Sequence, residues 1–378
     1  MRRAAAWLAV GALGAAGATS RAHAAPWQVT AEAGVEDDSN VQRVDTGPGL
    51  DTAPIQSFVE RAGVRLDGRG KLLGGGYALT LGALARVADS SDAKPESVTL
   101  FNVDGRWLHP IGDGAVSIGA GATFADALPL DDDIGDRTFR YGGGDAIVSL
   151  KGGDDKRLTL AVGGRDFVYK PDHSFDWVGP VANARLDITL WGSPERTKGL
   201  DLGIQLGAES RDYHAHALAN GCAPNAPPDP TCSVGTSIPR HDRFKRAGVE
   251  LLYTGRVIAT LGYQMTVVDS NSYSFSIRRH RALAQVTTAL PWHFYATALG
   301  ILDIDTYTDG YLLSADTQHL TYASLDDEDR SSLQLRLARP LTKTWSIEGR
   351  AAIWRDLGTT MATSFHRELG YLGVIYSR

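Results

Sequence analysis

Long hydrophobic runs are scarce in this sequence of 378 residues. A helix that crosses a membrane needs about 20 consecutive apolar residues. Past the N-terminal segment the best stretch, Leu72 to Ala85, is shorter and rich in glycine. This excludes a bundle of transmembrane helices. Hydrophobic residues nevertheless make up 43% of the chain, a normal share for a folded protein, so a disordered chain is excluded as well.

Basic charge is not in excess either. The 38 Lys and Arg residues are outnumbered by 44 Asp and Glu residues, which gives a net charge of −6. The one tight basic group is Arg278, Arg279, His280 and Arg281. Because nucleic acids are held by clustered Lys and Arg side chains, we expect no nucleic-acid partner.

Catalytic and metal-binding motifs are also missing. The sequence contains no G-x-S-x-G, and it places no histidine beside a particular serine, so a nucleophile with an identifiable base is lacking. No recognised spacing of Cys and His ligands occurs. We therefore expect no enzyme activity, no catalytic residue, no metal site and no cofactor.

Cysteine is nearly absent. The only two, Cys222 and Cys232, enclose the proline-rich segment CAPNAPPDPTC. In an oxidising compartment two such residues in one loop predict a disulfide, which would stabilise the fold by about 3 kcal/mol. His214, His216 and His241 lie nearby in the sequence. They leave a metal site as the less favoured alternative, since the ligand spacing is not a recognised one.

The first two dozen residues have the features of a secretory signal peptide. Arg2 and Arg3 give a charged start, residues 4–18 are apolar and rich in alanine, and Ala22-His23-Ala24 fits the small-x-small cleavage rule. We predict a signal peptide over residues 1–24, cleavage after Ala24, and an exported mature domain over residues 25–378.

What the chain has in abundance is glycine, with 42 residues, and a regular alternation of apolar and polar side chains. Near the start, Ala31, Ala33 and Val35 alternate with Glu32 and Glu36. The same period of two recurs in segment after segment to the C-terminus. Such alternation gives a β-strand one apolar and one polar face, and scattered glycine suits turns and curved sheets. Both features predict an all-β fold.

The connections between these segments alternate in length. Long polar connections fall at about 37–55, 89–97, 125–137, 169–178, 210–242, 269–278, 305–330 and 356–364, and short ones at about 67–71, 109–114, 151–155, 192–197, 254–256, 290–292 and 339–343. This plan is typical of outer-membrane barrels, which have short turns on one side and long loops on the other. We predict a transmembrane antiparallel β-barrel of about sixteen strands, within a range of 14 to 18. Region 305–330 is taken as a hairpin above the membrane in preference to two further spans.

With these features the chain resembles the porin-like barrels of Gram-negative outer membranes. The segment AEAGVEDDSNVQRV (Ala31 to Val44) is similar to the opening of barrels in surface-lipoprotein translocators and poly-N-acetylglucosamine exporters, although the helical-repeat domain of those families is missing. The strand Gly370 to Tyr376 looks like the C-terminal signal that the barrel assembly machinery reads, but it is followed by Ser377 and Arg378. The resemblance implies a place in the outer membrane, with lipid, lipopolysaccharide and the assembly machinery as partners. A periplasmic export partner is a further option.

Charged residues recur on the polar side of the predicted strands. An arginine that faces the hydrocarbon at the middle of a bilayer costs about 2 to 4 kcal/mol, so these side chains are expected to face the lumen. The predicted lumen-lining residues are Glu32, Arg61, Arg65, Arg86, Asp104, Arg106, Arg157, Arg185, Asp187, Asp201, Glu209, Arg246, Glu250, Arg281, Arg336, Glu348 and Arg350.

Two functions fit this pattern. Because sixteen strands usually leave a lumen too wide for side chains to fill, the favoured one is a channel for polar solutes or for a secreted polysaccharide across the outer membrane. The alternative is a non-conducting scaffold or adhesin of the envelope that acts through its extracellular loops.

Overall fold

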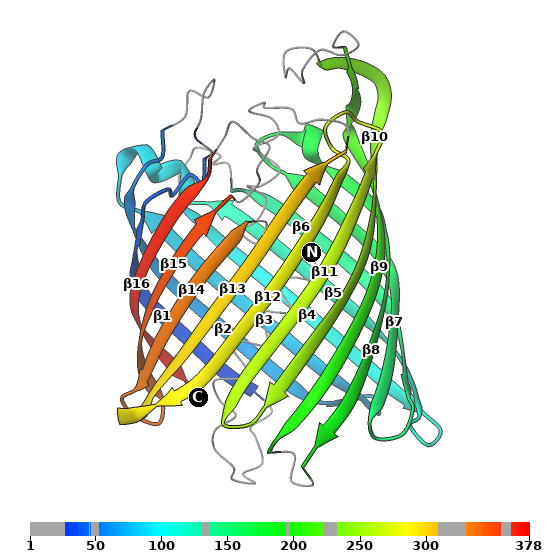
Figure 1. Ribbon diagram of the computed structural model, residues 1–378, viewed down its shortest axis with the longest axis vertical. Coiled ribbons are helices and arrows are strands. Elements are labelled where there is room, and N and C mark those ends of the chain that lie inside the picture. The colour runs from blue at the N-terminus through cyan, green and yellow to red at the C-terminus, as the bar shows by residue number, and fades with distance from the viewer. Residues whose placement is uncertain are drawn as a thin grey trace.

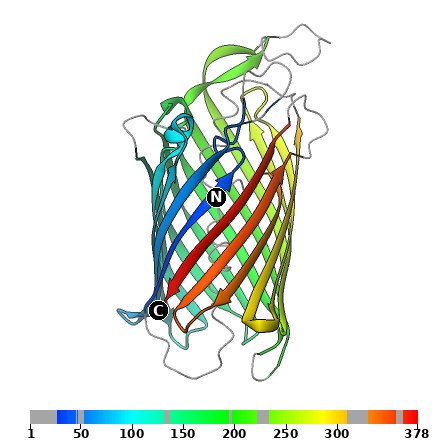
Figure 2. The same cartoon turned by 90° about the vertical axis from the view of Figure 1, so that its left-hand side faces the viewer.

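The computed structural model is a closed barrel of sixteen antiparallel strands (Figures 1 and 2). It describes residues 27–44, 46, 53–130, 137–193, 197–221, 233–308, 330–356 and 364–378. The strands are β1 Trp27–Asp38, β2 Ser57–Leu72, β3 Gly75–Ala88, β4 Val98–Ile111, β5 Val116–Pro129, β6 Phe139–Lys151, β7 Lys156–Tyr169, β8 Trp177–Gly192, β9 Gly199–Asn220, β10 Ser233–Thr254, β11 Val257–Ser270, β12 Ile277–Leu290, β13 Phe294–Tyr307, β14 Ser331–Pro340, β15 Trp345–Arg355 and β16 His366–Ser377. The all-β fold, the barrel and the strand number predicted from the sequence are confirmed.

Every strand pairs with its neighbours in sequence, and β1 closes the ring against β16. In this closing pair Gly34 lies opposite Gly373, and Glu36 lies opposite Tyr371. Closure satisfies the backbone groups that an open sheet would leave unpaired in lipid. Among the described residues, three short 3-10 helices lie in the connections: η1 Ser91–Glu96, η2 His173–Phe175 and η4 Pro291–His293. Within the described ranges, no helix has the length and apolar character to cross a membrane.

One connection differs from the prediction. The segment 210–242 was expected to be a long loop, but β9 continues to Asn220 and β10 begins at Ser233, so most of it is a β-hairpin of two 22-residue strands. In Figure 1 this hairpin rises above the rest of the barrel. Its upper part escapes a search for apolar outward faces, because the outward positions Asp212, His214 and His216 are polar and the apolar positions, such as Tyr213, face inward.

Several predictions fall on residues that the structure does not describe. The predicted signal peptide, both cysteines and most of region 305–330 lie outside the described ranges. The disulfide between Cys222 and Cys232 and the cleavage after Ala24 therefore stay predictions. For region 305–330, β13 ends at Tyr307 and β14 begins at Ser331.

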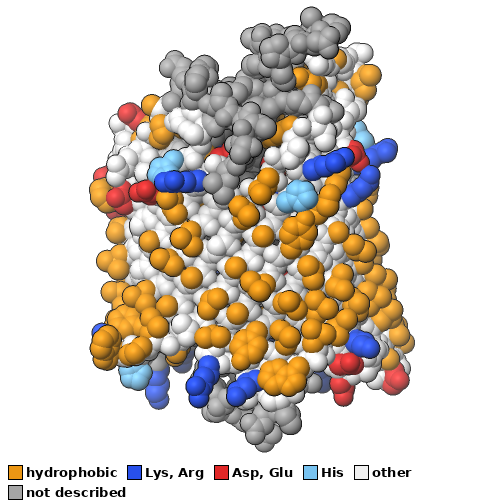
Figure 3. Space-filling model, viewed as in Figure 1, with side chains coloured by type: hydrophobic (Ala, Val, Ile, Leu, Met, Phe, Trp, Pro, Cys, Tyr) orange, Lys and Arg blue, Asp and Glu red, His pale blue; other side chains and the backbone are white. Residues whose placement is uncertain are grey.

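The outer face of the barrel is apolar over a broad band (Figure 3). Along each strand the exposed large hydrophobic side chains follow the period of two, as in Leu333, Leu335 and Leu337 of β14. Alternate positions of the same strands point to the interior, where the charged side chains gather. This division, with apolar residues outward and polar residues inward, is the one that a barrel in lipid requires.

Candidate functional site: the inner face of the barrel

The candidate site is the inner wall of the barrel. All seventeen charged residues singled out in the sequence alternate with the exposed apolar side chains of their strands, and so lie on the inner face. The structure brings many of them together in ion pairs. Two groups on the wall differ in chemistry, and they are described in turn.

The first group centres on Glu32 of β1. Its two carboxylate oxygens bind two different arginines: Arg61 Nε of β2 donates to Oε1 at 2.7 Å, and Arg350 Nη2 of β15 donates to Oε2 at 3.0 Å. Arg350 also pairs with Glu348, which pairs in turn with Arg336 of β14. Glu348 is fully buried between these two guanidinium groups. A chain of alternating charges therefore crosses β14, β15, β1 and β2.

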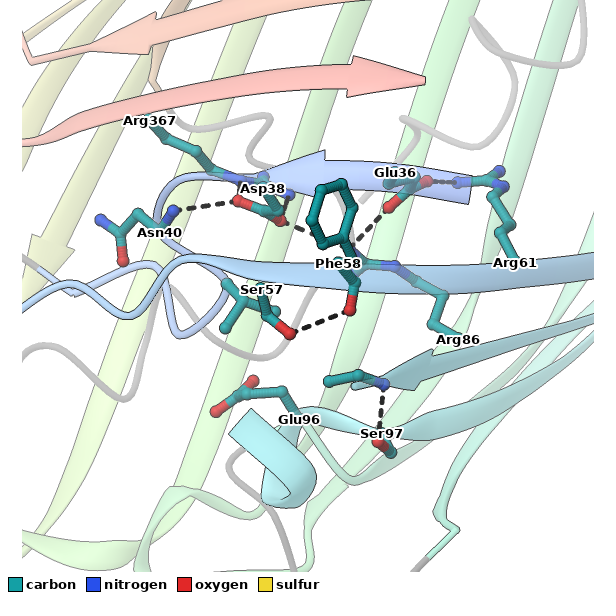
Figure 4. Close-up of polar contacts among 12 residues, drawn as sticks. Glu36, Asp38, Asn40, Ser57, Phe58, Arg61, Arg86, Glu96, Ser97 and Arg367 are labelled. Carbon is teal, nitrogen blue, oxygen red and sulfur yellow. Dashed lines mark hydrogen bonds and ion pairs between the residues drawn. The ribbon is translucent and has the colours of Figure 1, made fainter. Parts of the chain in front are cut away.

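The same chain continues toward the long-loop end of the barrel (Figure 4). Glu36 accepts from Arg61 Nη1 at 3.0 Å and from Arg86 Nη2 of β3 at 2.9 Å. Asp38 is held by both ends of the Arg367 guanidinium of β16, at 2.8 Å from Nε and 2.6 Å from Nη2. Bidentate pairs of this kind are the strongest that arginine forms. We call this set the ionic wall: Glu32, Glu36, Asp38, Arg61, Arg86, Arg336, Glu348, Arg350 and Arg367.

A tyrosine lies within the ionic wall at the seam between the first and last strands. The guanidinium of Arg350 lies 4.5 Å from the centre of the Tyr371 ring. The ring also covers Gly34 and Gly373, because a Cβ atom built on Gly34 would lie only 2.6 Å from Tyr371 Cε2, and one built on Gly373 would collide with the tyrosine hydroxyl. These two glycines leave the space that the ring occupies.

The remaining predicted residues lie outside this wall. Seven of them form ion pairs elsewhere: Arg65 with Asp67, Arg185 with Asp187 and Glu250, Arg246 with Glu209, and Arg281 with Asp303. Asp201 accepts a hydrogen bond from Thr189 Oγ1 at 2.7 Å. In the described part of the chain, Asp104, Arg106 and Arg157 have no ion-pair partner within 4.0 Å.

The second group was not found from the sequence. Aromatic side chains pack together on the inner face near the long-loop end, across strands β4 to β9 and η2. We call it the aromatic wall; its buried members are Val98, Ala127, Phe139, Phe167, Tyr169, Phe175, Trp177 and Tyr213. The Phe167 ring stacks between Phe139 and Trp177, at 5.9 Å between centroids on each side. These residues break the polar pattern of their strand faces, and that break was the available signal.

Two arginines cover this aromatic wall on the side of β9 and β10. The Arg211 guanidinium lies 4.2 Å from the Trp177 ring and 4.0 Å from the Phe244 ring. The Arg240 guanidinium lies 4.1 Å from Tyr213 and 3.6 Å from Phe275. Arg211 also donates to Glu209 at 2.6 Å. Stacking on rings and pairing with carboxylates are the two modes that suit a planar guanidinium.

Two of the three histidines that had suggested a metal site lie beside carboxylates. His241 Nδ1 lies 2.5 Å from Asp212 Oδ1, and His214 Nδ1 lies 3.7 Å from Asp176 Oδ2. Across the described residues, no group of three or more His, Cys, Asp or Glu side chains is arranged to hold a metal ion.

Comparison with known proteins gives a likeness of fold only. No family model and no curated protein sequence matches the chain. Solved structures do. OprB of Pseudomonas putida matches with a TM-score of 0.47 and 11% identity, over 93% of this chain and 94% of that one. A bacterial polysaccharide outer membrane secretin matches at 0.44 and 7%, over 93% and 97%. A triple mutant of the Rhodopseudomonas blastica porin matches at 0.40 and 10%, over 93% and 99%.

These likenesses are too distant to assign a role. The chain's own architecture is sufficient to classify the fold, since it combines sixteen antiparallel strands, full closure and an apolar outer band with a charged interior. In fold, the protein is a porin-like β-barrel.

Proposed function

We propose that this barrel is an outer-membrane channel for polar solutes. The observation that carries the proposal is the inner face itself, which is lined by charged side chains and which the described residues do not fill with a continuous apolar core. Arginines and carboxylates at Arg65, Asp67, Arg185 and Asp187 are all partly exposed on this face. An apolar outside and a wet, charged inside are what a conduit through lipid needs.

Exposure differs between the two ends of the interior. Toward the short-turn end, the side chains of Asp187 and Glu250 are each 42% exposed. Toward the long-loop end, the side chains of Glu36 and Asp38 are 3% and 0% exposed. The described interior side chains are therefore more accessible to water at the short-turn end than near the long loops, where Glu36 and Asp38 lie.

The proposed solutes are uncharged or zwitterionic, such as sugars. Opposite charges alternate along the wall, as in Glu32, Arg61, Glu36 and Arg86, so no long stretch of one sign selects a cation or an anion. Paired carboxylates and guanidinium groups offer many acceptors and donors to hydroxyl groups. A polysaccharide strand passed on by a periplasmic partner is one form that such a solute could take.

Planar-bilayer recording tests the proposal. Mature protein, residues 25–378, is refolded and inserted into bilayers in potassium chloride, and folding is checked by heat-modifiable mobility on gels. We expect discrete conductance steps, and partial block of the current by added oligosaccharide. Correctly folded barrels that stay electrically silent would overturn an open channel and favour the scaffold or adhesin alternative.

A further inference from the structure

A serine, a histidine and an aspartate form a hydrogen-bonded chain on the outer face of β9 and β10. His241 of β10 lies opposite Asp212 of β9. The next outward pair toward the membrane is Arg243 and Ser210. Ser210 Oγ lies 3.2 Å from His241 Nε2, and His241 Nδ1 lies 2.5 Å from Asp212 Oδ1. This is the order of groups that activates a serine hydroxyl as a nucleophile.

The neighbours of His241 fix which of its ring nitrogens carries the proton. The ionised Asp212 carboxylate can only accept, so Nδ1 donates to it. Arg243 Nε can only donate, and it lies 3.2 Å from Nε2, so Nε2 accepts and carries no proton. Nε2 is also the nitrogen that Ser210 Oγ reaches. The imidazole is thereby held in the neutral form that can take the proton of the serine.

The strand register, and not a local motif, creates this arrangement. Ser210 and His241 are 31 residues apart in the sequence and meet because β9 pairs with β10. The serine lies within a strand, where no G-x-S-x-G turn is needed to present it. Stability does not account for the arrangement, since the Asp212 side chain is 65% exposed and exposed pairs contribute at most about 1 kcal/mol.

The serine lies at the upper edge of the apolar band. Below it on the outward face of β9 are Ala208, Leu206 and Ile204, and Leu206 is 57% exposed. Above it the outward positions become polar, beginning with Asp212. In a bilayer this is the depth at which the hydrocarbon ends and the polar head groups begin. An acyl chain that lies along Leu206 and Ala208 would present its ester carbonyl to Ser210.

We propose that Ser210 and His241, oriented by Asp212, hydrolyse carboxylic esters of long-chain fatty acids at the long-loop surface of the membrane. Ser210 Oγ attacks the ester carbonyl carbon, and its proton passes to His241 Nε2. The tetrahedral intermediate expels the alcohol, which takes this proton from Nε2, and the acyl group stays on Oγ. A water molecule then gives a proton to Nε2 and attacks the acyl carbon. The proton returns to Oγ as the fatty acid leaves.

Arg243 is placed to stabilise the negative charge that develops on the carbonyl oxygen. Its Nε already lies beside the reacting Nε2 atom, and among the described residues its two terminal nitrogens have no acceptor. Once Nε2 has taken up the serine proton, it no longer accepts from Arg243. The guanidinium can then turn to the oxyanion, where one donor is worth about 100- to 1,000-fold in rate.

Ester hydrolysis by the mature barrel, residues 25–378, refolded in an ester-free detergent, tests the proposal. The substrates are p-nitrophenyl acetate and p-nitrophenyl palmitate. In a second measurement, a long-chain alkyl fluorophosphonate labels activated serines, and peptide mass spectrometry locates the label. Four variants remove the members of the site in turn: S210A, H241Q, D212N and R243Q. The controls S237A and H214Q change an exposed serine and an exposed histidine of the same hairpin. Heat-modifiable mobility checks the folding of each.

We expect faster hydrolysis of the palmitate ester than of the acetate ester, and a label on Ser210. S210A should lose both hydrolysis and label. H241Q and D212N should lower kcat by about 100- to 10,000-fold, D212N without a change in KM, and R243Q should lower kcat by about 100-fold. Both controls should match the parent.

Hydrolysis or labelling that survives S210A would overturn the proposal, as would a folded parent that is neither active nor labelled. Equal rates on the two esters would overturn the preference for a long acyl chain. The site lies on the outer face and the proposed channel lies inside the barrel, so S210A should leave the conductance unchanged. Failure of the hydrolase and failure of the channel can therefore be told apart.

Discussion

The ionic wall and the aromatic wall occupy neighbouring parts of one interior. The first runs from β14 through β1 to β3 and the second from β4 to β9, and they meet where Arg86 of β3 lies opposite Val98 of β4. Both lie toward the long-loop end and both are largely buried, yet one is made of paired charges and the other of stacked rings. The described side chains of one interior are thus packed by two different means.

The two walls differ in how much the burial of their side chains stabilises the fold. Phe139, Phe167 and Trp177 bury apolar area against one another, so the aromatic wall stabilises the fold by excluding water. The ionic wall gains little from burial, because desolvation of its charges offsets much of their attraction. The ionic wall instead fixes the orientation of its side chains, since each carboxylate is held by two or more donors. We infer that the aromatic wall contributes net stability to the fold, whereas the intact ionic wall contributes little net stability and sets the shape and polarity of the interior.

The largest expected effect comes from breaking the ionic wall at Asp38. In Asp38→Ala, Arg367 loses both of its bonds to this carboxylate and Arg86 loses one neighbour. Leaving a buried charge without its partner costs about 3 to 5 kcal/mol, which guanidinium unfolding in detergent micelles would measure as a lower midpoint. Asp37→Ala is the control, because Asp37 faces outward and accepts from Gln56 at 2.9 Å; its change should stay within about 0.5 kcal/mol. Equal unfolding midpoints for the two variants would show that the buried pair of Asp38 and Arg367 does not stabilise the fold.

A smaller effect is expected from the aromatic wall. Phe167→Leu keeps a hydrophobic side chain of similar size but removes two ring contacts, to Phe139 and Trp177. We expect a loss of about 1 to 1.5 kcal/mol in the same unfolding experiment. Phe101→Leu on the lipid-facing side of β4 should change little, since Phe101 is exposed there. If Phe101→Leu lowered the free energy of unfolding as much as Phe167→Leu does, the inner aromatic cluster would contribute no more to stability than an exposed ring.

At the short-turn end of the interior, we expect the smallest effect on stability and a measurable effect on the ionic current. Asp187→Asn removes one carboxylate beside Arg185, which keeps Glu250 at 3.1 Å. Because Asp187 is well exposed, stability should change by less than about 0.5 kcal/mol. The reversal potential in a potassium chloride gradient should shift toward anion selectivity. Asp154→Asn, in a turn at the short-turn end, is the control and should not shift it. An unchanged potential in Asp187→Asn would place that carboxylate outside the conducting path.

Most of the fold could be predicted from the sequence because lipid imposes a rule on every strand. An outward residue such as Leu335 must be apolar, and an inward one such as Arg336 is free to be charged, so the period of two reveals the strands and their faces. The rule ends where lipid ends. Above the membrane the upper part of β9 reverses the two faces, with Asp212, His214 and His216 outward and Tyr213, Ala215 and Ala217 inward. A search for apolar outward positions misses such a strand.

The pairing of charges could not be predicted in the same way. Glu32 and Arg350 are 318 residues apart and meet only because β1 closes against β16. Alternation assigns a side chain to a face, but it does not fix the register that decides which carboxylate meets which guanidinium. The aromatic wall was missed for a related reason. Phe139, Phe167 and Trp177 belong to three strands, and each one alone resembles an ordinary aromatic near a strand end.

Tyr371, which lies where β1 pairs with β16, restricts the register in which the barrel closes. A slip of one residue between β1 and β16 would turn Tyr371 toward the lipid and bring Leu372 inside. A slip of two would put its ring over Glu32 or Glu36, where a side chain already fills the space that Gly34 leaves open. Only the native register accepts the ring. Tyr371 and its two glycines therefore favour the native register in the pair of strands that closes the barrel.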